Sequence, residues 1–256
     1  MSKTHLIIPD PHAVPGTDNN RADWIGELIK ELKPDVVING GDMWDMDSLS
    51  SYDKGKASFY GRKYKADIDA GKEFDERLWA PIKTAKKRLP FRVFLEGNHE
   101  HRIKRMLEYQ HELEGTVGFK DLELNKNYDA IVQYDGSTPG MIQIDGINYA
   151  HYFTSGVKGL PISGLNPARG LLYKTHESCT SFHLHTLDWA VETKASGKRI
   201  MGLFAGVGHE RKPGFAGLSS QLWFPCVIIK RNVSDGFYEP QFISLETLRK
   251  EYSTKA

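Results

Sequence analysis

The chain has 256 residues, of which 39% are hydrophobic and 26% are charged, and its formal net charge is +1. These values are typical of one large globular α/β domain. They exclude binding to nucleic acid or membrane through a global excess of charge, so any basic surface must be local. No apolar leader precedes the first apolar run and no stretch is long enough to span a membrane, so we expect a cytoplasmic protein.

The first hundred residues alternate predicted strands and helices, which indicates parallel βαβ units. Three short apolar runs are the expected strands, at 5–9, 35–39 and 91–95. Helices are expected at 21–32, capped by Asn19 or Asn20, and at 67–88, where Pro81 should kink or split the helix. The stretch 46–66 has no clear periodicity and is interpreted as an insertion in a single domain spanning 1–256.

The second half is richer in strands, but its strand order is not predictable from the sequence. Its expected strands are 130–134, 141–145, 148–151, 179–182, 200–205, 223–230 and 237–244, and helices are expected at 101–114, 167–177 and 245–252. The Gly/Pro/Ser-rich segment 154–164 is predicted to be a mobile loop. Cys179 and Cys226 lack CxxC spacing and are predicted to be buried free thiols of a reducing compartment.

Side chains suited to metal binding follow each of the first three strands, and more histidines follow in the second half. Ligands bind at the carboxyl ends of strands in open α/β sheets, so these side chains are expected to converge. Carboxylate, amide and imidazole donors together suit Mn²⁺, Fe or Zn²⁺ better than Ca²⁺. Seven donors exceed the needs of one tetrahedral ion, whereas two ions sharing a carboxylate would use them all: Asp10, His12, Asp42, Asn98, His151, His183 and His185.

The order of these motifs resembles that of the calcineurin-like metallophosphoesterases, whose pattern is D-x-H, G-D-x-x-D, G-N-H-[DE], a lone H and G-H-x-H. The matching segments here are 10–12, 41–45, 97–100, His151 and 182–185. The resemblance implies an α/β fold, a four-layer αββα sandwich of two mixed sheets flanked by helices. One departure is Phe182, which replaces the family's glycine and is expected to crowd the metal or line the pocket.

The resemblance also implies two divalent cations, with Mn²⁺ expected first and Fe, Zn²⁺, Ni²⁺ or Mg²⁺ as alternatives. The first ion would be held by Asp10, His12 and His185, the second by Asn98, His151 and His183, and Asp42 would bridge both. His99 would sit beside the leaving group, with Asp45 as its orienting partner. Gly208-His209-Glu210 is a rival for the last motif. We prefer His183 and His185 because each metal then gains an imidazole.

The implied activity is hydrolysis of phosphodiesters, including nucleotides or nucleic acid, by a hydroxide that bridges the two metals. A phosphomonoesterase acting on proteins or metabolites is an alternative. The branch that dephosphorylates proteins usually has Arg where this chain has Met46, which disfavours that option. A non-catalytic binding protein with a relic metal site is a further alternative. The oligomeric state is not predictable from the sequence.

Two features outside the motifs are candidate substrate contacts. The stretch 52–65 interleaves basic and aromatic residues, which suits a nucleic-acid groove with stacking platforms, although a solvated loop would have the same composition. Arg102 lies one helical turn from Arg105 and is a candidate phosphate ligand, with an ordinary surface ion pair as the alternative. Arg169, beside the segment 154–164, is a second candidate phosphate ligand.

Overall fold

The computed structural model describes residues 2–253, except the side chains of residues 214 and 215. A six-stranded sheet has the order β13-β12-β1-β2-β3-β4. Strands β1 to β4 are parallel, whereas β12 and β13 run antiparallel to their neighbours. The strands are β1 (Lys3–Ile8), β2 (Val36–Asn39), β3 (Phe91–Leu95), β4 (Ala130–Val132), β12 (Cys226–Ser234) and β13 (Phe237–Ser244).

The second sheet is also mixed and has five strands, in the order β10-β11-β9-β6-β5. Its central strands β11, β9 and β6 are parallel, and its two edge strands are antiparallel. The strands are β5 (Met141–Ile144), β6 (Ile147–Ala150), β9 (Cys179–Ser181), β10 (Leu187–Thr193) and β11 (Arg199–Ala205), and a separate small hairpin pairs β7 (Thr154–Ser155) with β8 (Leu160–Pro161).

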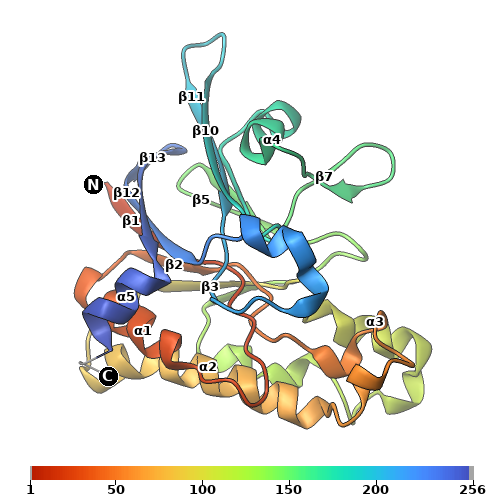
Figure 1. Cartoon of the computed structure of the whole chain (residues 1–256). Helices are drawn as coiled ribbons and strands as arrows, with labels where there is room; N and C mark the ends of the chain where they lie inside the picture. Colours follow the sequence, from red (N-terminus) through yellow and green to blue (C-terminus); the bar gives the residue numbers. More distant parts are fainter. Residues whose placement is uncertain (1, 254–256) are drawn as a thin grey trace.

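Helices lie on the outer faces of the two sheets (Figure 1). The α-helices are α1 (Asn20–Leu32), α2 (Tyr64–Thr84), α3 (His101–Tyr109), α4 (Pro167–Thr175) and α5 (Leu245–Tyr252). Short 3₁₀ helices are η1 (Asp47–Leu49), η2 (Ala57–Phe59), η3 (His111–Leu113), η4 (Phe119–Leu122), η5 (Leu124–Lys126) and η6 (Gly214–Leu222). Helices α1, α2 and α5 pack together beneath the large sheet, and α4 packs on β9, β10 and β11. The predicted αββα arrangement is therefore confirmed.

Strand β1 shows why the large sheet is buried on both faces. Successive side chains of a strand point to opposite faces. Leu6 and Ile8 belong to the core between the sheet and its helices, whereas Ile7 belongs to the core between the two sheets. A strand covered on both faces reads as a continuous apolar run, which is how this strand was recognisable in the sequence.

Several element predictions were wrong in detail. Helix α2 begins at Tyr64 and ends at Thr84, and Pro81 lies in its last turn without splitting it. Asn19 occupies the N-cap position of α1 but makes no side-chain capping hydrogen bond, and its amide donates to the carbonyl of Ala70 at 3.2 Å instead. The predicted helix at 101–114 ends at Tyr109, and η3 follows it. Strand β10 was not predicted.

Other sequence predictions hold. Cys179 and Cys226 are both free and buried. Helix α5 has the predicted bounds and is capped by Ser244, whose hydroxyl accepts from the N–H of Thr247. Within residues 2–253, no helix combines the length and the apolar character that a membrane span requires.

Candidate metal centre

The turns that follow β1, β2 and β3 bring three pairs of predicted site residues to one edge of the large sheet. The pairs are Asp10 and His12, Asp42 and Asp45, and Asn98 and His99. The carboxyl ends of parallel strands meet at this edge, so the pairs become neighbours. Five of the predicted ligands adopt left-handed backbone conformations, which cost energy for non-glycine residues and cluster at functional sites. Their φ values are 28° for Asp10, 45° for His12, 48° for Asp42, 70° for His183 and 63° for His185.

The predicted second-metal group forms around Asp42. His151 Nε2 lies 3.0 Å from Asn98 Oδ1 and 3.3 Å from Asp42 Oδ2. His151 Nδ1 donates to the carbonyl of Gly40 at 2.7 Å, which directs the other ring nitrogen toward the site. Asp42, His151 and His183 offer ligand atoms that all lie within 4.8 Å of one another. This spacing suits one shared cation.

The predicted first-metal group lies on the other side of Asp42. His12 Nε2 is 3.2 Å from His185 Nε2 and 3.8 Å from Asp42 Oδ2, and His185 Nε2 is 3.4 Å from Asp10 Oδ2. Asp10 Oδ1 is buried without a hydrogen-bond partner among the described residues. A buried carboxylate oxygen without a partner is costly, and a cation would satisfy it. The residues present therefore fit a metal at this position.

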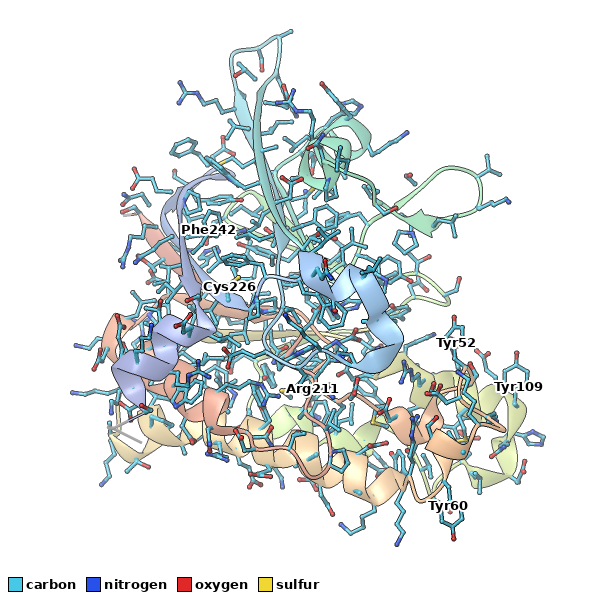
Figure 2. The ribbon with its side chains drawn as sticks, in the orientation of Figure 1. Tyr52, Tyr60, Tyr109, Arg211, Cys226 and Phe242 are labelled. Carbon is cyan, nitrogen blue, oxygen red and sulfur yellow. The ribbon has the colours of Figure 1, made fainter. Side chains whose placement is uncertain are left out.

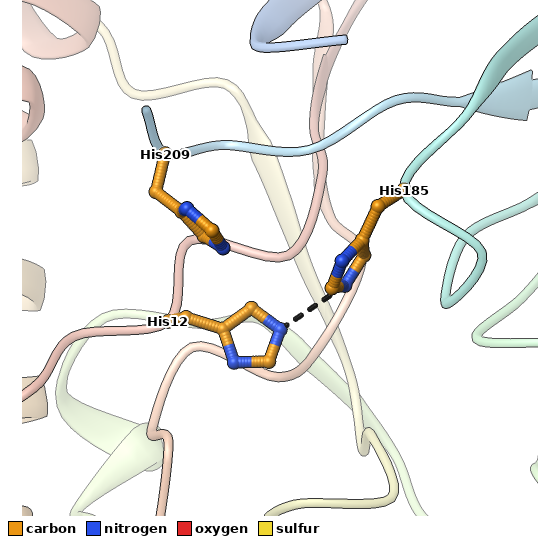
Figure 3. A group of neighbouring side chains, drawn as sticks. All are labelled: His12, His185 and His209. Atoms are coloured by element: carbon orange, nitrogen blue, oxygen red, sulfur yellow. Dashed lines mark hydrogen bonds between the residues drawn. The ribbon is translucent and has the colours of Figure 1, made fainter. Parts of the chain in front are cut away.

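His209 lies in the same cluster, so the two rivals for the last motif are both present. Its ring centroid is 5.3 Å from that of His12 and 5.9 Å from that of His185 (Figure 3). However, His209 Nδ1 accepts the backbone N–H of Arg211 at 3.1 Å. His12, His185 and His209 nevertheless offer ligand atoms that all lie within 4.8 Å of one another. His209 therefore stays a rival, and the choice of His183 and His185 stays a prediction.

Charges within the cluster set the protonation of its central pair. Burial would raise the pKa of Asp42, but the charges of His151 and His99 and the hydrogen bond from His151 together hold it well below its usual range. Burial would lower the pKa of His151, yet the Asp42 charge and hydrogen bond raise it to about 10. The pair therefore has an anionic and a cationic member, and a metal would have to displace the proton of His151 to bind there.

His99 is surrounded by groups that orient its ring. Its Nδ1 donates to the backbone carbonyl of Asp45 at 2.6 Å, and Asp45 Oδ1 is 3.2 Å away. The Asp45 carboxylate is nearer to His12, with Oδ1 accepting from His12 Nδ1 at 2.8 Å, and Oδ2 accepts from Arg211 at 3.2 Å. Burial lowers the pKa of His99, but Asp42 and Asp45 outweigh it and raise the pKa.

Arg102 and Arg169, the two predicted phosphate ligands, lie in different places. The Arg102 guanidinium donates to His99 Nε2 at 3.2 Å and to the carbonyl of Asp45 at 2.9 Å, so it borders the cluster. Arg169 pairs with Glu192 of β10 at 3.2 Å instead of with a member of the cluster. The phosphate-binding role of both residues stays a prediction.

Phe182 does not crowd the site, in contrast to one expectation. Its ring is 1% exposed and belongs to the core between the two sheets. A methyl group added to Gly40 would lie 2.2 Å from the ring, so Phe182 fills the space that this glycine leaves. The Phe182 N–H donates to the carbonyl of His151 at 2.9 Å. This backbone hydrogen bond thus helps to fix the position of His151.

The position of Glu100 at the start of a helix predicts an ordinary first-turn acid that favours the helix dipole, and the structure corrects this prediction. The side chain is fully buried. Its Oε2 accepts the N–H groups of Asp42 and Gly97, and its Oε1 accepts that of Trp44, each at 2.9 Å. Glu100 therefore ties the turn after β2 to the turn after β3. The only sequence signal was an acid directly after the Gly97-Asn98-His99 turn, which does not distinguish the two roles.

The fold and the site define a class of two-sheet αββα protein with histidines and aspartates at its strand ends. Comparisons with known proteins agree with this class. The calcineurin-like phosphoesterase family profile matches residues 4–195. The chain belongs to the calcineurin-like phosphoesterase family.

Two individual proteins are also similar. Gene 54 protein of Mycobacterium phage D29 is 30% identical over 137 residues, which are 53% of this chain and 49% of that protein. The chain thus spans about half the length of this relative. One solved crystal structure aligns with 95% of this chain and 100% of its own, at 10% identity and a TM-score of 0.45, values too low to support an inference.

We expect Glu100→Gln to lower both the free energy of unfolding and the affinity for Mn²⁺. The amide would place a donor against buried backbone N–H groups, each of which costs about 1–3 kcal/mol when unpaired. Urea unfolding and Mn²⁺ titration of the same preparations would measure the two effects. Glu108→Gln, on the exposed side of α3, is the matched control. Undiminished Mn²⁺ affinity in Glu100→Gln would show that this carboxylate does not organise the turns.

We expect His183→Ala and His185→Ala each to reduce bound metal, whereas His209→Ala should retain it. The reason is that His185 Nε2 already lies 3.4 Å from Asp10 Oδ2, a predicted ligand of the same ion, whereas the Arg211 N–H occupies His209 Nδ1. Metal content after equilibrium dialysis against Mn²⁺, measured by elemental analysis, would decide. Loss of metal in His209→Ala with retention in His185→Ala would reverse the assignment.

Proposed function

We propose that this protein hydrolyses phosphodiesters, with nucleotides or nucleic acid as the substrate class, through two divalent cations. The family match supports metal-dependent phosphoester hydrolysis, and the His/Asp groups on either side of Asp42 support two cations. The ligands would be those predicted above: Asp10, His12 and His185 for one ion, Asn98, His151 and His183 for the other, and Asp42 for both. We propose Mn²⁺ as the first metal to test.

The cations, when bound, would lower the pKa of a shared water and neutralise charge on the phosphoryl oxygens. The remaining chemistry belongs to the chain. His99 would donate a proton from Nε2 to the leaving oxygen, because its Nδ1 is held by the Asp45 carbonyl. Arg102 now donates to that same Nε2. A substrate phosphate would compete for the Arg102 guanidinium. Once Arg102 turned to the phosphate, His99 Nε2 would be free to carry the proton.

One observation favours a diester over a monoester. Arg102 lines a groove of about 250 Å³, formed by the segment after β2 and by helix α3. A diester would fill two positions, with one substituent in this groove and the leaving group beside His99, whereas a monoester has a single substituent and would leave one position empty. A phosphomonoesterase and a non-catalytic metal-binding protein are the competing outcomes of the test below.

We expect the Mn²⁺-loaded protein to turn over bis-p-nitrophenyl phosphate with a higher kcat/KM than p-nitrophenyl phosphate. Both esters release the same chromophore, so one absorbance assay compares them directly. Chelated protein is the control for metal dependence. A preference for the monoester would identify a phosphomonoesterase. Metal binding without turnover of either ester would favour the non-catalytic alternative.

We expect His99→Ala to keep its metal and to lose about 10²–10⁴-fold in kcat on a dinucleotide, the usual loss for a missing proton donor. Aryl diesters should be affected less, because p-nitrophenolate leaves readily without a proton. His111→Ala, an exposed histidine of η3, is the control. Loss of metal in His99→Ala would make His99 a ligand, and equal losses on both substrates would contradict general-acid catalysis.

A further inference from the structure

The groove beside Arg102 combines positive charge with exposed aromatic rings. It lies between the segment after β2 and helix α3 and has a volume of about 250 Å³. The side chains relevant to its chemistry are Tyr52, Lys54, Arg102, Arg105, Met106 and Tyr109. Three of them are cationic, two are tyrosines, and Met106 supplies an apolar wall. No acidic side chain lines the groove in the part of the chain that the structure describes.

The positive charge of the groove is largely uncompensated. Across residues 2–253, Lys54 and Arg105 form no ion pair within 4.0 Å, and the carboxylate nearest to Arg102 is Asp47, at the 4.0 Å limit. Three other cations of the stretch 52–65 do form ion pairs. Lys56 and Arg62 both pair with Asp53, and Lys65 pairs with Asp69. An anionic ligand would therefore find unpaired cations in the groove, whereas Lys56, Arg62 and Lys65 are already paired.

The aromatic residues at the groove are available for stacking. Tyr52 is 79% exposed and Tyr109 is 83% exposed, and both lie at the same edge of the molecule beside α3 (Figure 2). Tyr64 of the same stretch is not available, because its hydroxyl donates to Asp121 at 2.9 Å. Bases stack on exposed aromatic rings regardless of their identity. A ligand with a flat ring and a negative charge matches both properties of the groove.

Arg102 connects the groove to the candidate metal centre. Its guanidinium lines the groove and contacts His99 Nε2 at 3.2 Å, so a group in the groove is one side chain away from the reacting phosphate. We propose that this groove binds the nucleoside of a nucleotide phosphodiester, with its base between Tyr52 and Tyr109 and its phosphate on Arg102. This proposal rests on the proposed function, because it places the nucleoside of that substrate beside the same site.

The test compares the binding of adenosine monophosphate and inorganic phosphate to the Mn²⁺-loaded protein by calorimetry. Tyr52→Ala and Tyr109→Ala should each weaken binding of adenosine monophosphate about 5- to 150-fold, the loss expected for one stacking contact. Inorganic phosphate should bind all variants alike. Tyr60→Ala is the matched control, because Tyr60 is 94% exposed on the same segment but does not line the groove.

The two proposals can fail separately. Equal affinity for adenosine monophosphate and phosphate, or an equal loss in Tyr60→Ala, would overturn the nucleoside groove even if diesters are hydrolysed. Selective weakening in Tyr52→Ala and Tyr109→Ala without turnover of any diester would keep the groove and overturn the proposed function. Arg105→Gln adds a test of charge, since it should weaken binding of adenosine monophosphate and reduce its dependence on salt.

Discussion

The geometry of the candidate site depends on one buried carboxylate. Glu100 accepts three backbone N–H groups from two turns that are far apart in the sequence. Asp42 and Trp44 donate from the turn after β2, and Gly97 donates from the turn after β3. Burial, and then the nearby charge of Asp42, raise the pKa of Glu100 to about 7. A cation bound to Asp42 would offset the second cause and favour the Glu100 anion. A bound cation would thus strengthen the Glu100 hydrogen bonds that position the two turns of the site.

The buried carboxylate of Asp45 also connects several side chains of the cluster. Its Oδ1 accepts from His12 and also lies 3.2 Å from His99 Nδ1, while Oδ2 accepts from Arg211. One carboxylate therefore fixes the ring of a predicted metal ligand and supports the predicted proton donor. The two functions of the site share this anchor, so a change at Asp45 would affect both at once.

Much of the site was predictable because parallel strands fix where their carboxyl ends lie. Once 5–9, 35–39 and 91–95 were assigned as strands, Asp10, Asp42 and Asn98 had to meet at one edge. Glu100 was misjudged because its partners are defined by the tertiary structure. The hydrogen bond that His209 Nδ1 accepts from the backbone N–H of Arg211 is likewise defined by the folded loop, which no motif encodes. Strand β10 was missed because its side chains are mostly half-buried and give no clear alternation.

The topology of the large sheet has a consequence for biosynthesis. β1 lies inside the sheet, with β2 on one side and β12, residues 226–234, on the other. One edge of β1 thus stays unpaired until β12, which lies far along the chain, has been added. Contacts so distant in sequence are slow to form. The turn with Asp10 and His12 follows β1 directly, so this half of the centre would mature only after β12 has paired with β1.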